Sequence, residues 1–116
     1  MTLEGGSEFT RVFLVDVGSE AEVEGDRLFG SHKKWMEATH PRDGALALLH
    51  YSVAKGTDSI TGKVGYLLLE IYASPEGVDN HHELAKSWED VDAFRTWVHA
   101  NQIVALDKPV VVKSIA

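Results

Sequence analysis

Four residues in the second half of the chain have the side chains that proton-transfer chemistry needs: Glu70, Tyr72, His81 and His82. An imidazole, with an ordinary pKa of about 6.5, takes up or releases a proton close to neutral pH. Glu70 stands in an apolar run, where a carboxylate has to be paired, exposed or raised in pKa, and a raised pKa would make it a base. We therefore expect these four residues to form the catalytic set. The alternative is structural, with His81 packed at a helix–sheet seam and Glu70 bonded to Arg, His or backbone donors.

Four further residues are candidates for the lining of a substrate pocket: His32, Trp35, His50 and Tyr66. Strand alternation puts Tyr66 on the same face as Glu70, and helical spacing puts His32 and Trp35 on one apolar stripe. Such rings can orient an aromatic substrate in an apolar pocket. The alternative is that they belong to the core, and that His50 lies either in the pocket or at a dimer seam.

The six histidines do not predict a metal site, because no two of them stand at His-x-x-x-His spacing with a third ligand nearby. Zero cysteines exclude thiolate ligands, thiolate catalysis and disulfides. Only ligands brought together from distant positions would make such a site. The chain also has no phosphate-binding Gly-Lys-Ser/Thr loop and no serine nucleophile elbow, so we expect no cofactor.

Composition places the chain among single-domain globular proteins: 116 residues, 44% hydrophobic and 25% charged, with no apolar run of membrane-spanning length. A net charge of −7 argues against nucleic acid, whose phosphates need a Lys/Arg footprint, and no membrane partner is expected. The segment Met1–Ser7 contains Glu4 and no apolar stretch, so we expect no secretory signal and a cytoplasmic location.

Local patterns predict one domain over residues 8–116, after a disordered segment 1–7. The predicted helices begin after Ser19 and at Ser74-Pro75-Glu76, which are N-terminal capping signals. The expected strands are Phe9–Val17, Ala45–Ala54, Lys63–Ala73 and Val110–Ile115, and the expected helices are Glu20–Thr39, 75–87 and Trp88–Val104. This is the β-α-β-β-α-β order of α+β ferredoxin-like folds, with an extra C-terminal helix.

The predicted strands are apolar on both faces, which two or three helices on one side cannot cover. Two sets of apolar residues alternate along these strands. One set is Leu46, Leu48, Leu67, Leu69 and Ile71, and the other is Ala47, Leu49, Leu68 and Tyr72. Soluble monomers avoid a large exposed apolar patch, and burial is worth about 25 cal/mol per Å². We therefore expect a homodimer that pairs through its sheet faces.

A short motif resembles the antibiotic-biosynthesis-monooxygenase-type family of dimeric α+β barrels. The family's Glu-x-(Trp/Tyr)-x-Ser strand end, with a His eleven residues after the Glu, is matched by Glu70, Tyr72, Ser74 and His81. Gly44 matches the glycine that opens the family's second strand. The resemblance implies a homodimer with face-to-face sheets and a pocket between each sheet and its helices. Members of that family include cofactor-free monooxygenases of aromatic polyketides, haem-degrading enzymes and isomerases.

Haem is not expected, since the haem-degrading branch carries an Asn on the first strand and a Trp on the third. Here Phe9–Val17 has no Asn and the aromatic residue is Tyr72.

The resulting hypothesis is a cofactor-independent monooxygenase or isomerase acting on a small aromatic or conjugated carbonyl compound. His81 or His82, with Tyr72, would deprotonate the substrate or polarise its oxygen. The alternative is a non-catalytic dimer that binds a hydrophobic small molecule or serves in a stress response.

Overall fold

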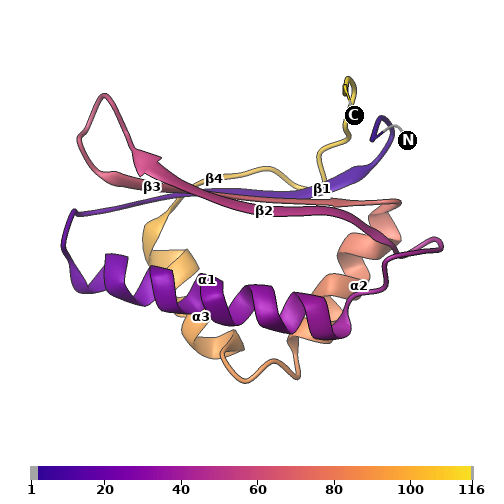
Figure 1. The fold of residues 1–116 in the computed structure, drawn as a ribbon, viewed down its shortest axis with the longest axis horizontal. Helices are drawn as coiled ribbons and strands as arrows, with labels where there is room; N and C mark the ends of the chain where they lie inside the picture. The colour runs from indigo at the N-terminus through magenta and orange to yellow at the C-terminus, as the bar shows by residue number, and fades with distance from the viewer. Residues whose placement is uncertain (1–2, 116) are drawn as a thin grey trace.

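The computed structural model describes residues 3–115, which form an α+β fold with one four-stranded antiparallel sheet and three helices. The strands are β1 (Ser7–Val15), β2 (Leu48–Thr57), β3 (Val64–Tyr72) and β4 (Gln102–Ala105). The helices are α1 (Glu20–Thr39), α2 (Pro75–Ala85) and α3 (Val91–Asn101). The strand order across the sheet is β2-β3-β1-β4. All three helices lie on one face of this sheet, so the molecule has two layers (Figure 1).

The predicted capping residues start the first two helices. The Ser19 hydroxyl accepts a hydrogen bond from the Glu22 amide at 3.2 Å, at the start of α1. Ser74 does the same for the Gly77 amide at 3.3 Å, and Pro75 is the first residue of α2. Because these signals are local, they fix where both helices begin.

The predicted C-terminal elements need correction. The strand predicted over Val110–Ile115 is wrong, since Val110 forms only an isolated bridge, with Ser7, among the described residues. The last strand is instead Gln102–Ala105, whose first three residues were predicted as the end of the helix Trp88–Val104. These residues form a strand because they pair with β1, which is far away in the sequence. The helical prediction rested on the spacing of nearby residues, and that spacing contains no information about such a partner.

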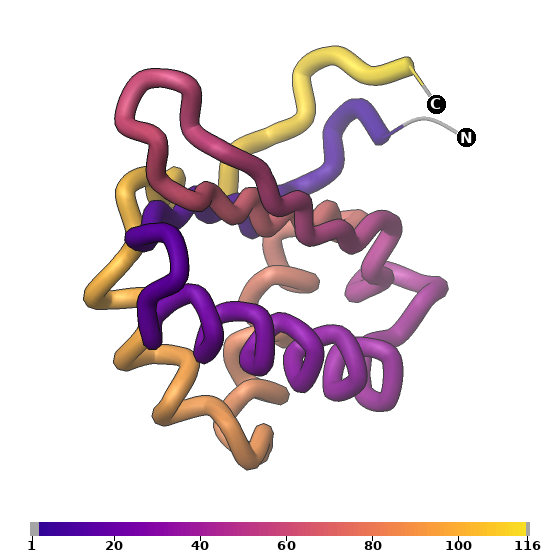
Figure 2. The backbone as a smooth tube through the Cα atoms, turned by 60° about the vertical axis from the view of Figure 1, so that its left-hand side comes forward, coloured from indigo at the N-terminus to yellow at the C-terminus, as the bar shows by residue number. Residues whose placement is uncertain are grey.

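The first and last segments of residues 3–115 lie next to each other on the helix-free side of the sheet (Figure 2). The Gly5 amide donates to the Val111 carbonyl at 2.8 Å, and the Val111 amide donates to the Gly6 carbonyl at 2.9 Å. Of the segment 1–7 that was predicted to be disordered, Met1 and Thr2 lie outside the described residues. The remaining part is therefore tied to the C-terminal segment, and it covers Ile71, which is only 5% exposed.

Two apolar clusters fill the layer between sheet and helices. The larger one includes Phe13, Leu28, Leu68 and Trp97, and the smaller one consists of Met36, Leu48, Tyr72 and Val78. Phe9 and Tyr51, from two strands, pack against both clusters. These two residues thereby join the two clusters into one core.

No helix among residues 3–115 has the length and apolar run that a membrane crossing requires.

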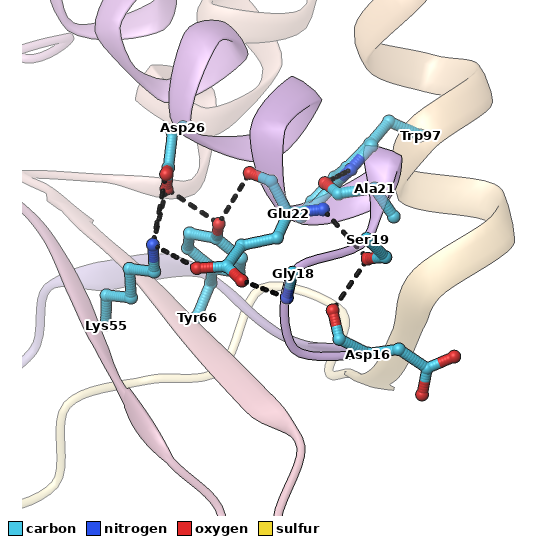
Figure 3. Close-up of polar contacts among 9 residues, drawn as sticks. All are labelled: Asp16, Gly18, Ser19, Ala21, Glu22, Asp26, Lys55, Tyr66 and Trp97. Carbon is cyan, nitrogen blue, oxygen red and sulfur yellow. Dashed lines mark hydrogen bonds and ion pairs between the residues drawn. The ribbon is translucent and has the colours of Figure 1, made fainter.

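A polar network ties α1 to the sheet (Figure 3). The Lys55 ammonium lies 2.8 Å from a Glu22 carboxylate oxygen and 2.9 Å from one of Asp26. The Tyr66 hydroxyl donates to Asp26 at 2.7 Å, and the Trp97 indole donates to the Ala21 carbonyl at 2.8 Å. These bonds hold the first half of α1 over β2 and β3, and against α3.

Two glycines of α1 should respond oppositely to substitution by alanine. A Cβ at Gly25 would lie 2.6 Å from the Trp97 ring, whereas one at Gly30 would meet nothing within 4 Å. We expect Gly25→Ala to lower the free energy of unfolding by about 1–3 kcal/mol through overpacking. Gly30→Ala should raise it by roughly 0.5–1 kcal/mol, because alanine has less freedom to lose on folding. Urea denaturation of both variants measures the difference, and shifts of equal sign would contradict this packing.

The helix-free face of the sheet carries an apolar surface, here called the outer face. It includes Val12, Leu14, Leu67 and Leu69, which alternate with the buried side chains of β1 and β3, and Ile103 and Val104 of β4, where the pairing with β1 has a register shift. Leu67 is 42% exposed and Ile103 is 56% exposed. The helices lie on the opposite face (Figure 1), and Gly6 of the N-terminal segment approaches Ile71 on this one.

Candidate functional site

A cavity of about 410 Å³ lies between the sheet and the three helices. Its walls are largely aromatic, with Phe9 from β1, Trp35 from α1, Phe94 from α3 and Trp88 from the segment before α3. The Trp35 and Trp88 rings are stacked, with centroids 5.1 Å apart and an angle of 15° between their planes. A planar, apolar ligand fits such walls.

The charged groups in the cavity wall are cations. Arg11 and Arg95 line it together with four histidines, and its described lining contains no aspartate or glutamate. The Arg11 guanidinium donates to the backbone carbonyls of Thr10 at 2.9 Å and Leu106 at 3.1 Å, and burial lowers its pKa. In a chain of net charge −7, these two arginines favour a ligand that carries or develops negative charge.

Glu70 of β3 is fully buried behind the cavity wall, next to the lining residues His32 and His81. Its Oε1 accepts a hydrogen bond of 2.5 Å from the Tyr72 hydroxyl. Burial raises the pKa of Glu70 to about 8, against the smaller opposing effects of Tyr72 and Arg11. The other carboxyl oxygen, Oε2, is buried and has no hydrogen-bond partner among the described residues. The carboxyl group is therefore only half satisfied.

Two buried histidines face this carboxyl group from different helices. His32 of α1 has Nε2 at 3.7 Å from Glu70 Oε2, and its Nδ1 is hydrogen-bonded to the Tyr51 hydroxyl at 2.8 Å. His81 of α2 has Nδ1 at 3.4 Å from Glu70 Oε1. Burial, and secondarily the neighbouring His40, lowers the pKa of His32 to about 3; burial also lowers the pKa of His81 well below 6.5. In both rings burial therefore favours the neutral form.

A chain of hydrogen bonds fixes the tautomer of His81. The Thr39 hydroxyl donates to the Trp35 carbonyl at 2.7 Å, so it accepts from His40 Nδ1 at 2.9 Å. His40 Nε2 consequently carries the lone pair, and it accepts from His81 Nδ1 at 2.9 Å. This network assigns the proton of neutral His81 to Nδ1 and its lone pair to Nε2.

His82 differs from its neighbour in that its ring makes no hydrogen bond to any other described residue. Its ring lies on the cavity wall and makes edge contacts with Phe9 at 5.2 Å and His81 at 5.2 Å between centroids. Burial lowers its pKa, with Arg11 the next largest cause. Both nitrogens of His82 are thus free to interact with a ligand.

The structure gathers half of the sequence-predicted site residues around the cavity. His32, Trp35, His81 and His82 line it, while Glu70 and Tyr72 lie behind the wall. The other two lie elsewhere. The hydroxyl of Tyr66 is bonded to Asp26, and His50 pairs with Ile71 on the outer face, where it is bonded to Ser52 at 3.0 Å.

Several residues of the site were not predicted from the sequence. Arg11 lies between Phe9 and Phe13 on the same face of β1. A charged residue on such an apolar strand face is a signal in the sequence that could have identified Arg11 as part of the site. His40 had no such signal, because its contact with His81 joins positions 41 residues apart. The convergence of His32, Glu70 and His81 was also missed: each offers a ligand atom, and these atoms lie within 4.8 Å of one another. This is the set that could hold a metal ion.

Comparison with known proteins leaves the chain unassigned. No protein-family model matches it. Neither a curated protein nor a solved structure matches it significantly. The geometry of the cavity and its residues is therefore the basis for any statement about function.

Proposed function

We propose that this protein is an enzyme that acts on a small aromatic or conjugated carbonyl compound, as a monooxygenase or isomerase that works without an organic cofactor. The observation that carries the proposal is the cavity beside His82, which combines aromatic walls with cationic groups. The stacked rings of Trp35 and Trp88 would hold the planar part of the substrate. Arg11 and Arg95 would bind the oxygen on which negative charge develops.

The chemical step we propose is removal of a proton from the carbon next to the carbonyl group. His82 would take this proton, since its ring is free of other hydrogen bonds, while Glu70 and Tyr72 support neighbouring His81 from behind. In an isomerase the proton returns at another carbon. In a monooxygenase the carbanion gives an electron pair to dioxygen, and the resulting hydroperoxide loses water to leave a new carbonyl group. A CH₂ group and O₂ thereby become C=O and H₂O.

We further propose that the fold is ferredoxin-like, that the active form is a homodimer of the α+β barrel type, and that the chain belongs with the monooxygenase-like family it resembles. The strand order β2-β3-β1-β4 supports the fold, with α3 as an addition. The apolar outer face supports the pairing. Exposed apolar residues of the C-terminal segment, Leu106, Val110 and Val112, would find cover on the second copy.

Ligand binding measured by tryptophan fluorescence tests the proposal, because two stacked indoles line the cavity. A panel of aromatic ketones and phenols is titrated, and each binder is assayed for turnover and oxygen consumption. We expect an anionic binder to quench the emission, and Arg95→Gln to weaken its binding more than that of a neutral ester of the same skeleton. Arg27→Gln, which removes a surface guanidinium paired with Glu24, is the matched control. Binding without turnover across the panel would instead support a non-catalytic binding protein.

A further inference from the structure

We infer that His32, Glu70 and His81 form a binding site for one divalent transition-metal ion, of the Zn²⁺, Fe²⁺ or Co²⁺ class, at the back of the cavity. The inference goes beyond the proposed function and does not depend on it. Two imidazoles and one carboxylate are the ligand set of many catalytic metal sites with open coordination positions. The three residues come from α1, β3 and α2.

The separations between the side chains are close to those around such an ion, with the three ligand atoms within 4.8 Å of one another. With bonds of about 2.1 Å, neighbouring ligand atoms around an ion lie about 3.0–3.4 Å apart. Here the distance from His81 Nδ1 to Glu70 Oε1 is 3.4 Å, and that from His32 Nε2 to Glu70 Oε2 is 3.7 Å. All three groups are at most 4% exposed, so they are held in place by packing.

The unsatisfied carboxyl oxygen is an independent sign that a cation is missing from this arrangement. If Glu70 is ionised, Oε2 carries buried negative charge with no hydrogen-bond donor among the described residues. If Glu70 is protonated on Oε2, the hydroxyl has no acceptor, because His32 Nε2 is too far away at 3.7 Å. A metal ion between Glu70 and His32 satisfies both groups at once.

The surroundings of the three residues are those of a metal site. The Tyr51 hydroxyl holds Nδ1 of His32 at 2.8 Å and leaves Nε2 directed at Glu70. His81 Nδ1 carries a proton and is bonded to His40 at 2.9 Å before an ion binds, so binding of the ion would replace both this proton and this bond. Because His32 and His81 also line the cavity, the remaining coordination positions of the ion would open toward it. A substrate oxygen bound there would be polarised by the ion.

Metal titration of the whole chain, without substrate, tests this inference. Chelator-treated protein is titrated with Zn²⁺ by calorimetry and with Co²⁺ by visible absorption. We expect one ion per chain, with Co²⁺ bands of four- or five-fold coordination. Glu70→Gln should weaken binding by at least about 100-fold. His50→Gln, which removes a histidine of the outer face, should leave the affinity unchanged.

A second measurement keeps the test independent of how the variant folds. The glutamine of the Glu70→Gln variant has the size of the native side chain and can still accept from Tyr72, and circular dichroism checks the fold of the variant. In the unaltered protein, Zn²⁺ should shift the imidazole ¹⁵N signals of His32 and His81 and leave that of His50 in place. Absence of saturable binding, or equal affinity in Glu70→Gln, would overturn the metal site. Neither result would bear on turnover, which the fluorescence and oxygen assays measure separately.

Discussion

Replacing His82 with alanine is expected to lower kcat by about 10²–10⁴-fold on any substrate that the protein turns over, with little change in substrate binding. The reason is that a positioned base acts on the proton in the transition state, while the aromatic walls and the arginines still hold the ground state. Steady-state kinetics of the variant, with fluorescence to measure the binding constant, separates the two effects.

Lys86→Ala is the control for that variant, since this exposed side chain lies just beyond the end of α2 and pairs with Glu83 on the surface. Its kcat should equal that of the unaltered protein. Undiminished turnover by His82→Ala would remove the histidine from the reaction. A large rise in KM with kcat unchanged would assign it to substrate binding instead.

Leu67→Glu is expected to convert the proposed homodimer into a monomer. Leu67 is at the centre of the outer face, where its neighbours across the sheet are Val12 and Ala54. In a symmetric dimer the change places two carboxylates in the interface. Removing these carboxylates from water costs about 3 kcal/mol or more, which raises the dissociation constant of the dimer roughly 100-fold or more. Sedimentation should then give the monomer mass of 12.8 kDa in place of twice that value.

Ile60→Glu controls for the added charge, because Ile60 is 92% exposed in the loop between β2 and β3 and lies outside the outer face. This variant should sediment like the unaltered protein. If the unaltered protein itself sediments at 12.8 kDa at micromolar concentration, the pairing of sheets is excluded.

The elements that sequence analysis predicted well are those fixed by neighbours in the chain. The helix 20–39 agrees with α1 because Ser19 caps its start and Pro41 prevents its continuation. The strand around Glu70 agrees with β3 because its apolar run is bounded by Gly62 and Pro75. The error at the C-terminus arose where propensity and pairing disagree. The valines at 110–112 favour a strand, but within residues 3–115 only Val110 forms a bridge, to Ser7, whereas Gln102–Ala105 pairs along β1.

The site could be predicted as a list of residues but not as an arrangement. Glu70 and His81 were singled out because a carboxylate in an apolar strand and a histidine in a short motif are unusual. Their convergence with His32 depends on how α1 and α2 pack across the sheet. This packing cannot be derived from the spacing of residues along the chain. The same is true of the Tyr72 hydroxyl. Tyr72 shares a strand face with Glu70, as predicted, yet its hydroxyl donates to the carboxyl group and the residue does not line the cavity.

The joined chain ends have a topological consequence. Leu3 and Ser114 are within hydrogen-bond distance, 3.2 Å from amide to hydroxyl, so a short peptide could close the backbone into a ring. Opening that ring at the loop around Ile60 would give the circular permutant β3-α2-α3-β4-β1-α1-β2, in which every strand keeps its neighbours. In such a rearranged chain Glu70, His81 and His32 would follow one another in that order, and the cavity wall would be translated before the helix that closes it.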